Sequence, residues 1–156
     1  MLLTLSVVHA MKSNFIRIPI LLTLLWLPSL AHADDIKWDE SSVVKADIDC
    51  DGLLDTAKLG YIENRVRLSV TLGADGSTQS IEFDLGKSDH QDSLCGSNVV
   101  LKVTDMDYDL KEAFSENPEG FQQSKTCHGL DVSAGDCDSM HIFWNHKTKH
   151  INWWRL

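Results

Sequence analysis

Residues 140–155 read MHIFWNHKTKHINWWR. Two alternating segments, Met140–Asn145 and His150–Arg155, flank a polar turn. Alternation with a period of two is typical of strands with one buried face, so the pair predicts a β-hairpin. If Asn145 pairs with His150, one face becomes wholly apolar and consists of Ile142, Trp144, Ile151 and Trp153. A slip of one residue would expose both tryptophans, so this register is strongly selected.

The opposite face of this hairpin carries His141, Phe143, Asn145, His150, Asn152 and Trp154. Phe143 and Trp154 are candidates for an exposed aromatic surface that meets a protein or glycan partner. His141 and His150 share the face without being directly opposite each other. We interpret them as exposed side chains rather than metal ligands.

The preceding residues show the same short alternating segments separated by turn residues. Strands are expected at 56–62, 65–72, 80–85 and 99–104, with a hairpin turn at 73–76. Residues 108–123 contain helix-forming residues but are broken by Pro118 and Gly120, which leaves room for one short helix. The pattern predicts a mainly β fold (β-rich α+β), a small antiparallel sheet or sandwich with hairpins and at most one short helix.

The first 33 residues are typical of a secretory signal peptide. Lys12 and Arg17 precede an apolar run of 13 residues from Ile18 to Leu30, and Ala31-His32-Ala33 fits a signal-peptidase site. A membrane-spanning helix needs roughly 20 apolar residues, so this run of 13 is too short for a membrane anchor. No membrane span is therefore expected once the signal peptide has been cleaved. Met11 opens a complete signal by itself and is an alternative start. A single mature domain at 34–156 is expected in the periplasm or outside the cell.

The chain is acidic, with 23 acidic and 14 basic residues and a net charge of −9. Two of the basic residues, Lys12 and Arg17, leave with the signal peptide, so the mature part is more acidic still. A surface of this sign repels phosphate backbones and disfavours nucleic-acid binding.

All four cysteines, Cys50, Cys95, Cys127 and Cys137, lie in the mature part. An even number in an oxidising compartment indicates two disulfides, for which three pairings exist. We favour Cys127–Cys137, which closes a short loop, together with Cys50–Cys95. A redox or zinc role is disfavoured because the close spacing of paired cysteines is missing.

Residues 47–55 read DIDCDGLLD, with aspartates at loop positions one, three, five and nine. A calcium ion requires six to eight oxygen ligands, and alternate acidic residues on a tightly curled loop can supply several of them. The predicted ligands are the carboxylates of Asp47, Asp49, Asp51 and Asp55 and the main-chain oxygen of Leu53. Gly52 permits the sharp turn. The alternative is an acidic turn that binds no ion.

An EF-hand would need a glutamate at loop position twelve, where this chain has Lys58. Residues 45–86 instead resemble a single FG-GAP or VCBS-type repeat, as found in integrin-like β-propellers. The resemblance rests on the acidic loop, the strands that follow it and Asp75-Gly76. It implies calcium bound between adjacent strands. One copy cannot form a propeller of about four to eight blades, so a full propeller is not expected.

Other acidic groups give weaker signals. Asp105, Asp107 and Asp109 alternate as in the loop but lack its glycine, and they predict a solvated strand face or a second, weak cation site. Asp136 and Asp138 are the candidates for an acid and base pair in a hydrolase, yet no catalytic motif accompanies them. The closing 136–138 segment and the tryptophan-rich hairpin are also similar to those of small bacterial periplasmic proteins, which implies no activity.

Together these features predict an exported, calcium-binding, disulfide-stabilised accessory or binding module without catalytic activity. The alternative hypothesis is a secreted inhibitor or immunity-type protein that blocks a partner enzyme through its acidic surface.

Overall fold

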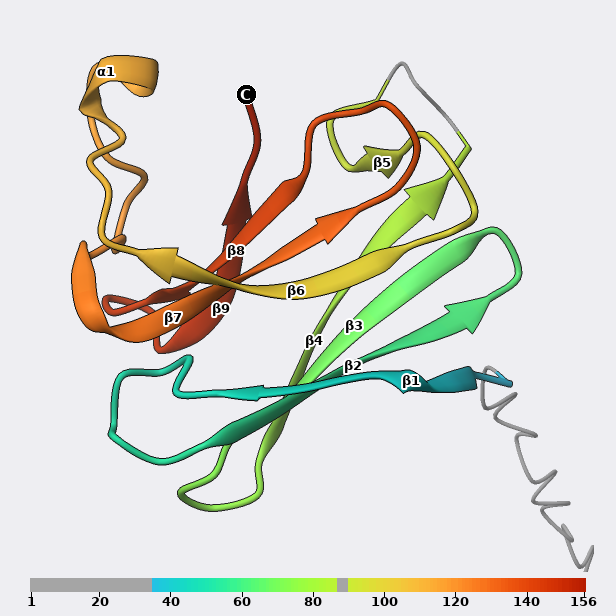
Figure 1. Ribbon diagram of the computed structural model, residues 1–156, viewed down its shortest axis with the longest axis horizontal. Helices are drawn as coiled ribbons and strands as arrows, with labels where there is room; N and C mark the ends of the chain where they lie inside the picture. Colours follow the sequence, from blue (N-terminus) through green and yellow to red (C-terminus); the bar gives the residue numbers. More distant parts are fainter. Residues whose placement is uncertain (1–34, 87–89) are drawn as a thin grey trace, which may run out of the picture. The chain divides into compact units, whose positions relative to one another are not determined.

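The computed structural model describes residues 35–86 and 90–156 (Figure 1). The predicted signal peptide at 1–33 lies outside these residues. The described elements are β1 (Lys37–Ala46), β2 (Asp55–Ile62), β3 (Arg65–Thr71), β4 (Thr78–Leu85), β5 (Ser93–Leu94), β6 (Val100–Met106), α1 (Lys111–Phe114), β7 (Ser124–Ser133), β8 (Met140–Asn145) and β9 (His150–Trp154).

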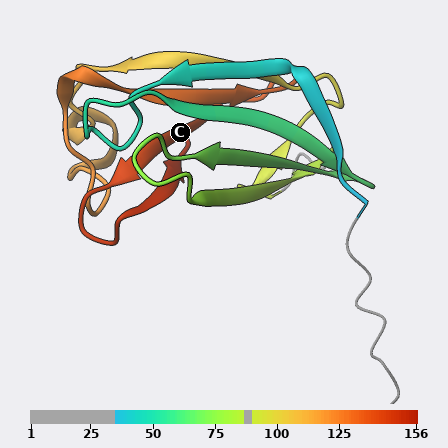
Figure 2. The ribbon, with the colours of Figure 1, turned by 90° about the horizontal axis from the view of Figure 1, so that it is seen from below.

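The strands form two sheets, ordered β1-β2-β3-β4-β5 and β6-β7-β8-β9. All neighbours pair antiparallel except β4 and β5, which pair in parallel. β1 also lies against β6, beside which it runs in Figure 2, and β4 lies against β9. The two sheets therefore enclose one interior, and the predicted mainly β class is confirmed.

One hydrophobic core fills the space between the sheets. Val66, Leu68 and Val70 of β3 are fully buried in it, as the alternation of that strand predicts. β8 and β9 pair Asn145 with His150, the register expected for this hairpin. Its apolar face packs into the same core with Ile142, Trp144, Ile151 and Trp153. Burial of such side chains, at about 25 cal/mol per Å² of apolar surface, is the main force that holds the sheets together.

A second, smaller cluster lies on the other face of the β8–β9 hairpin. Met106, Leu110, Phe121 and Phe143 form it, with Tyr108 and Trp154 partly buried around it. Phe143 is only 1% exposed because residues from the 107–123 segment cover it, so the expected exposed aromatic surface is wrong for Phe143. Trp154 is half-buried and stacks on His141 with ring centroids 4.0 Å apart.

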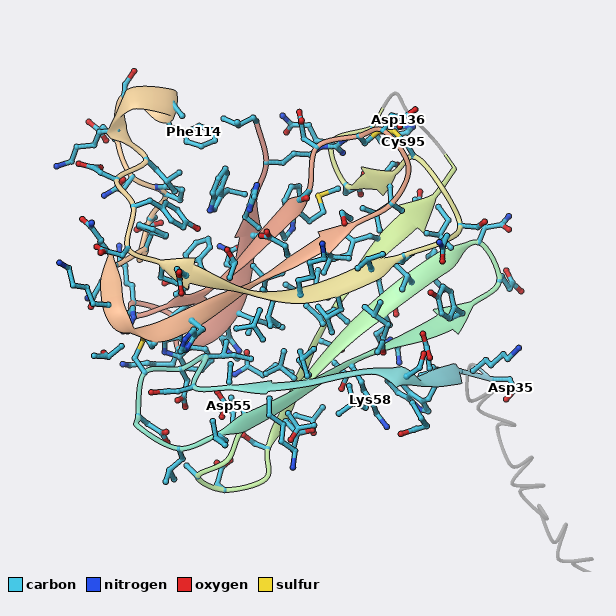
Figure 3. All side chains as sticks on the ribbon, in the orientation of Figure 1. Asp35, Asp55, Lys58, Cys95, Phe114 and Asp136 are labelled. Atoms are coloured by element: carbon cyan, nitrogen blue, oxygen red, sulfur yellow. A yellow bond between two sulfur atoms is a disulfide. The ribbon has the colours of Figure 1, made fainter. Side chains whose placement is uncertain are left out.

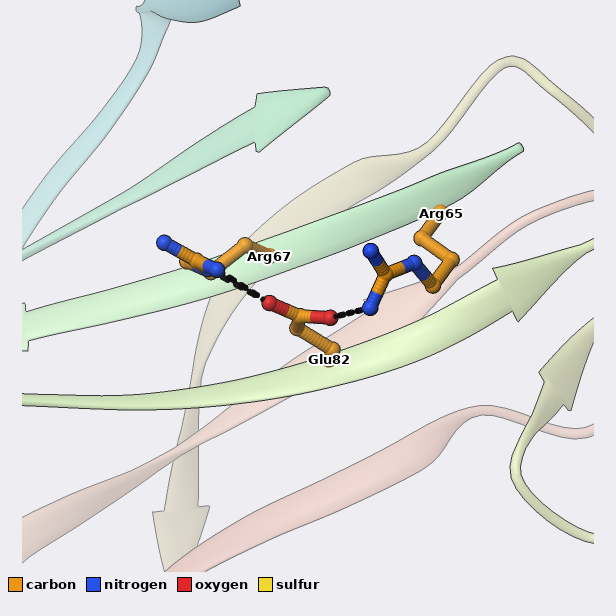
Figure 4. Close-up of polar contacts among 3 residues, drawn as sticks. All are labelled: Arg65, Arg67 and Glu82. Carbon is orange, nitrogen blue, oxygen red and sulfur yellow. Dashed lines mark hydrogen bonds and ion pairs between the residues drawn. The ribbon is translucent and has the colours of Figure 1, made fainter. Parts of the chain in front are cut away.

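The outer face of the first sheet is polar. Glu82 of β4 accepts hydrogen bonds from Arg65 and Arg67, which flank it from β3 (Figure 4). Such cross-strand charge pairs each contribute up to about 1 kcal/mol and favour one register.

The part of the chain that the structure describes contains no helix with the length and apolar character of a membrane span.

Candidate metal centre

The acidic loop connects β1 to β2, the first two strands of the first sheet. It begins after Ala46 and ends at Asp55, and these two residues pair with each other across the strands. Ile48 inserts into the main core and is 1% exposed, which anchors the start of the loop. Cys50 and Gly52 adopt left-handed backbone angles, with φ of 66° and 88°. These two positions curl the chain so that alternate side chains can turn inward.

Asp55 is the structural centre of the loop and is fully buried (Figure 3). One carboxylate oxygen accepts hydrogen bonds from the main-chain N–H groups of Ile48, at 2.8 Å, and Asp49, at 3.2 Å. The other oxygen accepts one from the N–H of Gly73 in the β3–β4 turn, at 2.8 Å. Hydrogen bonds of this charge-assisted kind compensate the cost of burying a carboxylate. Asp55 thereby joins the loop to the neighbouring hairpin.

The first two aspartates of the loop are fixed by its own backbone. The two Asp47 oxygens accept hydrogen bonds from the N–H groups of Asp51 and Gly52, both at 3.1 Å. Asp49 accepts a second contact from the Asp51 N–H, also at 3.1 Å. Because each donor comes from the curled turn, both carboxylates are held on the concave side of the loop.

Asp47, Asp49 and Asp55 converge. Each contributes one carboxylate oxygen to a group whose members all lie within 4.8 Å of one another, and this group could hold a metal ion. Burial raises the pKa of Asp49 above its ordinary value, and the charges of Asp55, Asp51 and Asp47 raise it further. A raised pKa at a half-buried carboxylate means that negative charge is disfavoured there, so a bound cation would relieve it.

The group of three carboxylates does not include the other two predicted ligands, Asp51 and the main-chain oxygen of Leu53. The Asp51 side chain is exposed and accepts a hydrogen bond from the Leu53 N–H at 2.7 Å. The Leu53 side chain is 50% exposed and that of Leu54 is 66% exposed. Coordination by Asp51 or by the Leu53 main-chain oxygen therefore stays a prediction.

A disulfide connects the middle of the loop to the second sheet. Cys50 is bonded to Cys127 of β7, with 5.0 Å between the Cα atoms. The expected Cys127–Cys137 bond is wrong because Cys127 begins an extended stretch of β7 that continues to Ser133. Six residues of strand span roughly 20 Å, far beyond the reach of a disulfide.

The second disulfide joins Cys95 to Cys137, with Cα atoms 5.6 Å apart, so the expected Cys50–Cys95 bond is also wrong. It links the loop before β6 to the loop between β7 and β8, on the side of the unit away from Asp55 (Figure 3). The two crosslinks therefore brace different connections of the same pair of sheets. Both fit an oxidising compartment.

Two histidines complete the surroundings of the loop, His128 of β7 and His146 in the turn between β8 and β9. The main-chain N–H of His128 donates a hydrogen bond to the main-chain oxygen of Asp47 at 2.8 Å. His146 Nε2 lies 3.6 Å from the Cys50 sulfur. Burial, with a smaller contribution from the charge of Lys149, lowers the pKa of His146. Sequence patterns missed both residues, since only the folded sheets bring them to the loop.

No protein-family model, curated protein or solved structure matches the chain. The likeness to an FG-GAP or VCBS repeat therefore continues to rest on the residues of the loop and its flanking strands.

The other candidate groups are dispersed. Asp105 and Asp107 are exposed near the end of β6, where Asp107 contacts Gln123 at 2.9 Å and Lys125 at 3.7 Å. His141 lies 2.7 Å from Asp131 across the second sheet, whereas His150 is exposed. Asp136 and Asp138 are both exposed between β7 and β8. The acidic loop is thus the described region in which three metal-ligating side chains converge.

Proposed function

We propose that residues 34–156 form an exported calcium-binding module that acts in binding or as an accessory protein, without catalytic activity. The observation that carries the proposal is the convergence of Asp47, Asp49 and Asp55, whose carboxylate oxygens lie within 4.8 Å of one another. Three carboxylates that meet on one loop are costly without a cation and favourable with one.

Calcium suits this loop better than a softer metal. The converging ligands are all carboxylates, and hard cations such as calcium prefer oxygen. The nearest sulfur atoms belong to the Cys50–Cys127 disulfide, which removes them as thiolate ligands for zinc. Asp51 and the Leu53 main-chain oxygen are the candidates to complete a shell of six to eight oxygens, with water at the remaining positions.

The role as a binding module is supported by the tip of the loop. Leu53 and Leu54 are both well exposed, directly beside the acidic group. An ion that orders the loop would also fix the positions of these two leucines. We propose that they form the contact with a protein partner, which would make the interaction dependent on calcium.

Titration of the mature protein with calcium tests the proposal. Thermal unfolding is measured in chelator and in calcium, and the melting temperature is expected to rise with calcium concentration. Asp49→Asn is expected to abolish this rise because it removes one ligand while keeping the size of the side chain. Asp138→Asn, on an exposed loop, is the matched control and should preserve it. Identical melting curves with calcium and with chelator would refute the site.

A further inference from the structure

A pocket of about 550 Å³ opens beside the first half of β1. Among the described residues, Lys37, Trp38, Asp39, Glu40 and Tyr61 line it. Its volume is within the range of small-molecule sites, roughly 300–1,000 Å³. The acidic loop begins at the other end of β1, seven residues after Glu40, which corresponds to roughly 20 Å of extended strand. The pocket is therefore distinct from the metal centre.

Trp38 is held in place by a glycine on the adjacent strand. Trp38 pairs with Gly60 of β2, and a Cβ atom on Gly60 would lie 2.6 Å from the Trp38 ring. The absence of a side chain at Gly60 thus lets the indole pack directly on the backbone of β2. A ring fixed in this way loses little conformational freedom when a ligand binds.

The ammonium group of Lys58 makes a cation–π contact with the Trp38 ring. The Nζ atom of Lys58 lies 4.6 Å from the centroid of the Trp38 ring and 3.5 Å from a carboxylate oxygen of Glu40. An aromatic face together with a carboxylate is the arrangement that binds ammonium ions in cation–π sites. Lys58 therefore identifies the kind of group that fits this part of the pocket.

The other lining residues lie on the opposite face of the two strands. Tyr61 pairs with Lys37, one position along from the Trp38–Gly60 pair, so strand alternation places Lys37, Asp39 and Tyr61 on the face opposite Trp38 and Glu40. Burial, together with the charge of Asp39, raises the pKa of Tyr61. The N–H and hydroxyl of Ser41 donate hydrogen bonds to Asp39 at 3.0 and 2.6 Å and lower its pKa. The ring and carboxylate that flank one ammonium position are therefore those of Trp38 and Glu40, in a chain whose overall negative charge attracts cations.

We propose that this pocket binds small organic ammonium compounds, with Trp38 supplying the aromatic face and Glu40 supplying the charge. Lys58 acts as an internal competitor that leaves the Trp38 ring when the ligand arrives. The proposal is independent of the calcium loop and goes beyond the function proposed above.

The experiment uses residues 34–156 with intact disulfides and choline as the probe. Binding is followed by the NMR signal of the Trp38 indole N–H, assigned from Trp38→Phe. The neutral isostere 3,3-dimethylbutan-1-ol and the neutral disaccharide maltose serve as comparison probes. A saturable shift with choline that exceeds the shift with either neutral compound supports the proposal. Equal shifts with choline and its isostere would identify a purely apolar pocket and overturn it, as would preferential binding of maltose or no shift at all.

Variants of Lys58 give a second, directional readout. Lys58→Met removes the internal ammonium and is expected to tighten choline binding about fivefold, the size of one exposed cation–π contact. Lys147→Met is the matched control, because Lys147 pairs with Glu119 on a different loop and should leave the affinity unchanged. Glu40→Gln in the Lys58→Met background should weaken binding again. Equal effects of Lys58→Met and Lys147→Met would contradict competition by Lys58 and overturn its role.

Discussion

Replacement of Asp55 by alanine should destabilise the protein severely, even without any metal ion. Asp55 is fully buried, and its carboxylate accepts the main-chain N–H groups of Ile48, Asp49 and Gly73. Alanine leaves these donors without their acceptor. Each buried donor that loses its partner costs about 1–3 kcal/mol. Since water can reach the partly buried Asp49 and Gly73 sites, we expect a total loss of about 3–5 kcal/mol.

A loss of this size is a large share of the stability of a small domain, about 5–15 kcal/mol in total. Urea denaturation in the presence of chelator measures it, because the chelator removes any contribution from a bound ion. Asp55→Asn should be intermediate, since its amide keeps one acceptor oxygen and presents a donor to the other N–H groups. Asp51→Ala, at an exposed position of the same loop, is the control and should cost below about 1 kcal/mol. If Asp55→Ala is no more destabilising than Asp51→Ala, the buried carboxylate does not organise this loop.

Three further changes have defined outcomes. Folding raises the pKa of Asp49, so the ionised carboxylate destabilises the folded state at pH values above that pKa. This destabilisation disappears as the pH falls through the raised pKa. Asp49→Asn should therefore raise the melting temperature in chelator at pH 7 and make the melting temperature less dependent on pH in the acid range. The double variant Cys50→Ser/Cys127→Ser should lose about 4.5 kcal/mol by the chain-entropy estimate for a separation of 77 residues, as read from urea unfolding. Gly60→Ala should cost about 1–3 kcal/mol in the same assay, because its Cβ would meet the Trp38 ring, and an unchanged midpoint would show that the ring does not pack there.

Local sequence patterns were sufficient to predict those strands in which one face is apolar and the other is polar. In β3, Val66, Leu68 and Val70 alternate with polar residues, and all three are fully buried. β1 and β7 were not predicted. The register of β1 shifts between Asp39 and Val44, which interrupts its alternation. A bulge of this kind changes which face a side chain occupies and hides the period of two.

Contacts between distant segments were not predictable from local patterns. Phe143 occupies the hairpin face opposite the main core, yet Phe121 packs on it from a loop more than 20 residues away, with ring centroids 5.6 Å apart. The predicted cysteine pairing was wrong for a related reason, because the position of β7 in the second sheet decides which cysteines Cys127 can reach. Local spacing predicted that four loop aspartates converge, and the structure brings together three of them, Asp47, Asp49 and Asp55. The role of Asp55 as an acceptor for Gly73 depends on the next hairpin and was not.

The disulfide between Cys50 and Cys127 makes the order of the acidic loop depend on the redox state of the compartment. In a reducing compartment the two thiols stay apart, and the turn between Asp49 and Asp51 loses its tether to the opposite sheet. A turn without this tether must lose conformational entropy when it surrounds an ion, which lowers its affinity for that ion. Oxidation removes that entropy in advance. If the acidic loop binds a metal ion as proposed, a newly made, reduced chain should bind it weakly, and the affinity should rise once the disulfide has formed.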